Sequence, residues 1–144
     1  MLSCVLDTDV IVAALRSSKG ASRQLLMAAL DRRFALLLSV PLLLEYEAVL
    51  TRREHLAASG MGATEVIAVL DDLAAVATPV RLAFRWRPLL GDPDDDMVLE
   101  TAINGGASAI VTFNRRDFAN AARDFEIRIW LPGETLQQIR SSAR

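Results

Sequence analysis

The stretch Asp92–Phe118, DPDDDMVLETAINGGASAIVTFNRRDF, contains the pattern that decides the fold. Its centre, Asp95–Asn104, is typical of a helix, and the following Gly105-Gly106 pair is a typical helix stop. The apolar run Ala109–Thr112 comes next and predicts a buried strand. A helix that leads into a buried strand is the repeating unit of a parallel sheet covered by helices.

Apolar runs and helical patterns alternate along the rest of the chain, which predicts an α/β fold with helices on both faces of the sheet. Pro79 weakens the third strand, and Thr64 is the expected N-cap of the helix that begins beside it. We expect strands at Ser3–Leu6, Ala35–Ser39, Val76–Leu82, Ala109–Thr112 and Glu126–Trp130. We expect helices at about Asp9–Ser17, Ala21–Asp31, Pro41–Arg53, Glu65–Ala75, Asp95–Asn104, Asp117–Ala122 and Pro132–Arg140, and a loop at Phe84–Asp92.

The length and composition indicate a single domain over residues 1–144. The chain is 52% hydrophobic and 24% charged, which is a globular balance with room for one core. No apolar run approaches the ~20 residues that span a bilayer, and the start lacks a basic leader and a cleavage site. The lone Cys4 cannot form an internal disulfide. We therefore expect a cytoplasmic protein without membrane contact, in which Cys4 packs in the core.

The charged residues do not exclude RNA as a ligand. A net charge of -2 argues weakly against nucleic acid. However, Lys19 is the only lysine among 16 basic residues, and arginine binds phosphate through two parallel hydrogen bonds. An arginine-rich coding bias is the alternative explanation.

Acidic and polar side chains follow two of the predicted strands. Asp7 and Asp9 come after the first strand, and Asn114 and Asp117 come after the fourth. Ligands of open parallel sheets bind beyond the carboxyl ends of the strands. The structural alternatives are Asp7 or Asp9 as a helix N-cap, and an Asx-turn with Asp117 as the next cap. A cap explains one aspartate after the first strand but not two.

Two predicted helices add further carboxylates. Asp96 ends the acidic run Asp92–Asp96 and lies in the first turn of its helix, where a solvated loop and the helix dipole are alternative reasons for acidic residues. Glu45 lies four residues after Pro41, near the end of the preceding strand, although alone it is an ordinary surface residue. Four separate segments thus place a carboxylate near one sheet edge. Mg²⁺ prefers such oxygen ligands, and it supports phosphodiester hydrolysis without a nucleophilic Ser, Cys or His.

These segments resemble the PIN-domain family, particularly bacterial VapC-type toxins and the related toxin-component group, over nearly the whole chain. Val5–Val12 is similar to the family's opening strand, Leu38–Glu45 to its second segment, and Asp92–Phe118 to its last two. The family commonly has Asn at the position of Asp9, so this chain departs from the pattern there. By resemblance the catalytic and metal-binding acids are Asp7, Glu45, Asp96 and Asp117, supported by Asn114, Thr112 and Asp9.

The resemblance implies a three-layer α/β sandwich around a five-stranded parallel sheet of order 3-2-1-4-5. It also implies a ribonuclease that uses Mg²⁺ or Mn²⁺ and cuts RNA. A small antitoxin is a frequent partner in the family, and a homodimer is common. Arg115 and Arg116 flank the acids and are candidate RNA contacts, with a solvated loop as the alternative.

Two other functions are open at this point. Asp7–Ile11 and Gly91–Asp96 imitate the motifs of a HAD-type phosphatase. That chemistry needs a later lysine, whereas Lys19 is the only one, and its second motif should follow a strand. The other alternative is a non-catalytic PIN-fold binding module with an incomplete metal site. A nuclease degrades RNA with Mg²⁺, a phosphatase releases phosphate from small esters, and a binding module does neither.

Overall fold

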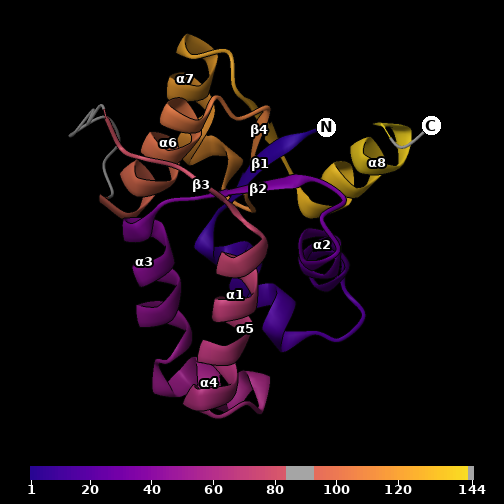
Figure 1. Cartoon of the computed structure of the whole chain (residues 1–144), viewed down its shortest axis with the longest axis vertical. Coiled ribbons are helices and arrows are strands. Elements are labelled where there is room, and N and C mark those ends of the chain that lie inside the picture. The colour runs from indigo at the N-terminus through magenta and orange to yellow at the C-terminus, as the bar shows by residue number, and fades with distance from the viewer. Residues whose placement is uncertain (84–92, 143–144) are drawn as a thin grey trace.

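Five parallel strands form the centre of the structure, a computed structural model that describes residues 1–83 and 93–142 (Figure 1). The strand order is β3-β2-β1-β4-β5, which confirms the predicted 3-2-1-4-5 sheet. The central strand β1 pairs in parallel with β2 on one side and with β4 on the other. The strands are β1 (Ser3–Leu6), β2 (Ala35–Leu38), β3 (Thr78–Pro79), β4 (Ala109–Val111) and β5 (Arg128–Trp130).

Helices cover the two sides of this sheet and complete the predicted α/β sandwich. In Figure 1, α1, α3, α4 and α5 lie below the strands, and α6 and α7 lie above them. Helix α6 packs against β1, β2 and β4, while α8 packs against α2 and β5. The helices are α1 (Thr8–Arg16), α2 (Ala21–Leu30), α3 (Val40–Leu50), α4 (Arg53–Ser59), α5 (Ala63–Val76), α6 (Pro93–Gly105), α7 (Arg115–Asp124) and α8 (Pro132–Ser142).

The two central strands are buried on both faces. Cys4, Val5 and Leu6 of β1 have no exposed surface, and neither do Ala109, Ile110 and Val111 of β4. Strands that are covered on both faces are continuously apolar rather than alternating, which is why these runs were visible in the sequence. Cys4 is a core residue, as predicted. Within the described part of the chain, no helix is long and apolar enough to cross a membrane.

The segment between α3 and α5 differs from the prediction. The predicted helix Pro41–Arg53 ends at Leu50, and a further helix, α4, follows it. Extended backbone at Arg52 separates the two helices, and Gly60 ends α4 in the left-handed region at φ +74°. A helix of seven residues shows less than two full periods, so the sequence pattern did not separate α4 from its neighbours.

Two smaller predictions also change. Thr64 is not an N-cap, because Gly62 holds that position and its N–H donates to Oε1 of Glu65 at 3.2 Å. The third strand is only Thr78–Pro79, at the edge of the sheet, where a proline is tolerated. The predicted loop Phe84–Asp92 lies outside the described residues.

Candidate functional site

A hydrogen-bonded group of polar side chains joins the carboxyl ends of β1 and β4. Asp7 directly follows β1 and is 6% exposed. Its Oδ1 accepts a hydrogen bond from the Thr8 N–H at 2.8 Å, so that Asp7 caps α1. Its Oδ2 accepts a hydrogen bond from Oγ1 of Thr112 at 2.7 Å. Thr112 directly follows β4 and is fully buried, so one carboxylate links the two strand ends.

Asp9 makes a second link between the same strand ends. Its Oδ2 accepts hydrogen bonds from the Phe113 N–H at 3.1 Å and from Nδ2 of Asn114 at 3.2 Å. The Asn114 N–H donates to Oγ1 of Thr112 at 2.9 Å. Asp7, Asp9, Thr112 and Asn114 therefore form one unit, which we call the β1–β4 cluster. All four were predicted from the sequence to belong to the site.

Burial makes the two carboxylates of this cluster costly to ionise. Desolvation, followed by the negative charge of Asp9, raises the pKa of Asp7 to about 7. The pKa of Asp9 is also raised, mainly by burial. Oδ1 of Asp9 is buried and has no hydrogen-bond partner among the described residues. Two close carboxylates and an unsatisfied oxygen need compensation by protons or by a cation.

The donor set fits a hard divalent cation. Mg²⁺ and Mn²⁺ bind carboxylate oxygens and keep several water ligands, and the Asp7–Asp9 pair offers such oxygens. Among the side chains that the structure describes, however, no group of three or more His, Cys, Asp or Glu residues lies close enough to hold a metal ion together. The structure therefore shows a carboxylate pair, and further ligands remain predictions.

Helix α3 packs close to this pair. Tyr46 is fully buried, and its O–H donates a hydrogen bond to the Leu6 carbonyl oxygen, one residue before Asp7. Burial, and then the charges of Asp7 and Asp9, hold the pKa of Tyr46 well above its usual range. The predicted acid Glu45 precedes Tyr46 and is partly buried. It thus lies on an element that contacts the end of β1.

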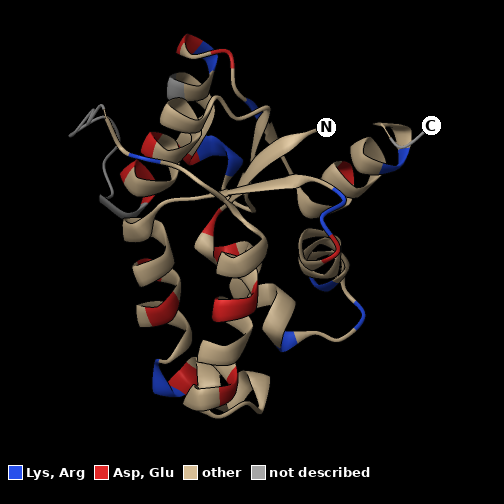
Figure 2. Cartoon of the chain, in the orientation of Figure 1, with Lys and Arg blue, Asp and Glu red and all other residues tan. Residues whose placement is uncertain are grey.

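Helix α6 brings two buried acidic residues against the sheet. Asp96, in its first turn, is 3% exposed, and Glu100, one turn later, has no exposed surface. Glu100 was not singled out from the sequence. Its spacing of four residues from Asp96 places both on one helix face and could have drawn attention to it. Figure 2 shows acidic positions on α6, on α3 and at the start of α1.

The predicted residues of α7 are exposed. Asp117 lies in the first turn of α7 and is not its cap, because the helix begins at Arg115. The Asp117 N–H donates to the Asn114 carbonyl oxygen at 3.1 Å. Nη1 of Arg115 lies 3.2 Å from Oε1 of Glu134 in an exposed ion pair. Arg116 is exposed as well.

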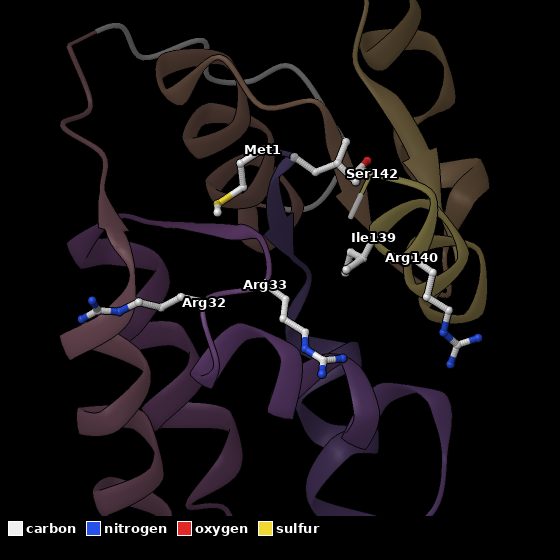
Figure 3. A pocket seen from close by; sticks show the side chains of 7 residues that line it. Met1, Arg32, Arg33, Ile139, Arg140 and Ser142 are labelled. Carbon is white, nitrogen blue, oxygen red and sulfur yellow. The ribbon is translucent and has the colours of Figure 1, made fainter. Parts of the chain in front are cut away.

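A pocket of 670 Å³ lies at the opposite edge of the sheet (Figure 3). It is lined by residues that precede β1 and β2 and by residues of α8, so it lies at the amino ends of these two strands and away from their carboxyl ends. Arg32 and Arg140 point to opposite sides of it in Figure 3 and do not converge on one point. The pocket lining consists of Met1, Leu2, Arg32, Arg33, Ile139, Arg140 and Ser142. It is not part of the predicted site.

Similarity to known proteins points to one family. Residues 3–116 match the family described as PIN domain. This range begins at β1 and ends in the first turn of α7, so it includes the whole β1–β4 cluster. No curated protein matches the chain.

Proposed function

Since this chain belongs to the PIN-domain family, we propose that it is a metal-dependent endoribonuclease that hydrolyses RNA phosphodiester bonds. PIN domains are generally nucleases, and they generally use divalent metal ions. The β1–β4 cluster is the observation in this chain that carries the proposal. It holds the buried carboxylate of Asp7 close to the partly buried carboxylate of Asp9, and it leaves one Asp9 oxygen without a hydrogen-bond partner in the described structure.

The proposed ligands are Asp7, Glu45, Asp96 and Asp117, which would hold one or two Mg²⁺ or Mn²⁺ ions. A bound ion would supply positive charge that activates water and stabilises charge on the phosphate. The protein itself orients the ligand carboxylates. Thr8 and Thr112 each donate to one oxygen of Asp7 and thereby fix its carboxylate.

The supporting residues have separate tasks. Asn114 is held by Asp9 and by Thr112, so its amide has a fixed place at the strand end. Arg116 is exposed beside this cluster and is the better placed of the two arginines to contact a phosphate, because Arg115 pairs with Glu134. This ion pair is exposed and weak, so Arg115 stays a second candidate contact.

The decisive experiment is RNA cleavage by purified variants with Mn²⁺ present. We expect Asp7→Asn and Asp96→Asn each to lower cleavage by about 100-fold or more, as is usual when one member of a catalytic group is removed. Asp71→Asn, an exposed position on α5, is the matched control and should cleave like the wild type. Undiminished cleavage by both site variants would show that the assignment is wrong.

Chelation tests the metal requirement independently. EDTA should stop cleavage by the wild type, and added Mg²⁺ or Mn²⁺ should restore it. Cleavage that continues in EDTA would exclude metal catalysis. A protein that neither cuts RNA nor changes with metal, but binds a partner, would be the non-catalytic module. The phosphatase alternative is not favoured by the family, and release of phosphate from small esters would be needed to revive it.

The biological role that we propose is the toxin of a toxin–antitoxin pair. The proposal rests on the resemblance to VapC-type proteins, and it includes a small antitoxin as partner and a homodimer as the assembly. Growth arrest on expression in cells, relieved by a short neighbouring gene product, would support it. Size measurement in solution tests the dimer, and a monomer at micromolar concentration would contradict that part.

A further inference from the structure

One exposed aromatic ring lies beside the β1–β4 cluster. Among the described residues, the large apolar side chains with substantial exposure are five aliphatic or sulfur-containing residues and Phe113, which is 50% exposed. Burial of a phenylalanine side chain stabilises a fold, and this fold forgoes part of that stabilisation at Phe113. The ring is also one residue away from Thr112 and Asn114, both members of the cluster.

The backbone that carries this ring is held in place. The Phe113 N–H donates to Oδ2 of Asp9 at 3.1 Å, and the next N–H, that of Asn114, donates to Oγ1 of Thr112 at 2.9 Å. The following helix, α7, begins at Arg115. In its first turn the Asp117 N–H donates a hydrogen bond to the Asn114 carbonyl oxygen. Residues 113–117 are all exposed. These bonds therefore hold the backbone of the exposed Phe113 at the β1–β4 cluster.

We infer that Phe113 is a stacking platform for a nucleobase next to the cleaved phosphate of a single-stranded RNA. The inference rests on the proposed ribonuclease function and adds how the substrate is held. An exposed ring suits any base, because every base has a flat apolar face. It does not suit a duplex, whose bases are already stacked and paired. Arg116 nearby supplies a positive charge for the adjoining backbone.

The test is RNA binding in an Asp7→Asn background, in which the substrate stays intact. With a labelled single-stranded RNA, Phe113→Ala should weaken binding by about 5- to 150-fold, the range expected for one base–aromatic stack. Phe113→Trp should bind at least as tightly as the parent, and Phe113→Leu should behave like alanine or only slightly better. Met27→Ala removes a side chain of matched exposure, 49%, on α2 and should bind normally.

A second measurement separates stacking from a loss of fold. Placing one abasic nucleotide at successive positions of the RNA should weaken binding by the parent most at one position beside the cut. With that abasic RNA, Phe113→Ala should not weaken binding any further than the abasic change already does, because the two changes remove the same contact. Equal losses with intact and abasic RNA at every position would overturn the inference, and so would an unchanged affinity of Phe113→Ala.

The outcome also distinguishes this inference from the proposed function. If the wild type cuts RNA and Phe113→Ala binds and cuts RNA equally well, the ring has no role in stacking and the nuclease stands. If the wild type neither binds nor cuts RNA, both fall. Phe113→Ala that binds RNA normally but loses a protein partner would assign the ring to a protein interface instead.

Discussion

At the scale of single residues, Asp7 is both a helix cap and a link between two strands. It caps α1 through the Thr8 N–H, as the structural alternative expected, and its second oxygen joins β4 through Thr112. Asp9 is not a cap, because its carboxylate accepts hydrogen bonds from residues after β4. The sequence could indicate that a helix cap accounts for only one of the two aspartates, Asp7 and Asp9. It could not show which partner the second one has, since that partner lies more than 100 positions away.

The pH dependence of stability follows from Asp7. Without metal, its pKa is about 7 in the folded protein and about 3.9 in the unfolded chain. Between these values the folded state holds a proton that the unfolded chain has released. The free energy of unfolding therefore falls as pH rises through this window, by up to about 4 kcal/mol. Urea denaturation in EDTA across the window measures it.

The control for this effect is substitution of the titrating group. Asp7→Asn should flatten the pH dependence and make the metal-free protein more stable than the wild type above about pH 7, while Asp71→Asn on exposed α5 should leave it unchanged. A pH profile that is the same in the wild type and in Asp7→Asn would contradict the raised pKa.

At the scale of elements, the sequence predicts those parts that local chemistry determines. β1, β2 and β4 are continuous apolar runs because helices cover both faces, and Gly106, at φ +62°, ends α6 as the glycine pair predicted. What local chemistry leaves open was missed. α4 is too short to show a period. The third strand was predicted at Val76–Leu82 but is only Thr78–Pro79, because its extent depends on pairing with β2. Glu100 is buried by the tertiary packing of α6, and its spacing of four residues from Asp96 was the one local sign of this.

The end of α6 is closely packed, and this yields a prediction about glycine. A Cβ at Gly105 would lie 2.8 Å from Cδ1 of Leu37 and 2.9 Å from Cγ2 of Val80. Gly105→Ala should therefore destabilise the protein by about 1–3 kcal/mol, the usual cost of overpacking. Gly133→Ala in α8 is the matched control, since nothing lies within 4 Å of the added Cβ. Equal stability of the two variants in chemical denaturation would contradict this packing.

Tyr46 joins α3 to the end of β1, so it tests how firmly the scaffold holds the site. Tyr46→Phe keeps the buried ring and removes the hydrogen bond to the Leu6 carbonyl. We expect a loss of about 1–2 kcal/mol in stability, and a fall in RNA cleavage because Asp7 follows Leu6 directly. A variant as stable and as active as the wild type would show that this bond does not position the site.

At the scale of the whole molecule, the fold gathers residues that are distant along the chain. The crossovers of a parallel sheet bring the ends of β1 and β4 side by side, and α3 and α6 pack against this region. The residue pattern alone predicted a parallel sheet. The strand order came from the family resemblance, because alternation of elements does not determine which strands are neighbours. The complete set of metal ligands likewise came from the family resemblance and stays a prediction.

Metal binding should stabilise the molecule globally. An ion that binds only the folded state raises stability by about 2.7 kcal/mol when its concentration is 100 times its Kd, and for a domain of this size that is roughly 5–11 °C in Tm. Added Mn²⁺ should therefore raise the Tm of the EDTA-stripped wild type, because it compensates the charges of Asp7 and Asp9. Asp7→Asn should start from a higher Tm at pH values above neutral and gain little from Mn²⁺. An equal gain in both proteins would place the ion elsewhere, and no gain in the wild type at millimolar Mn²⁺ would show that the β1–β4 cluster does not bind it.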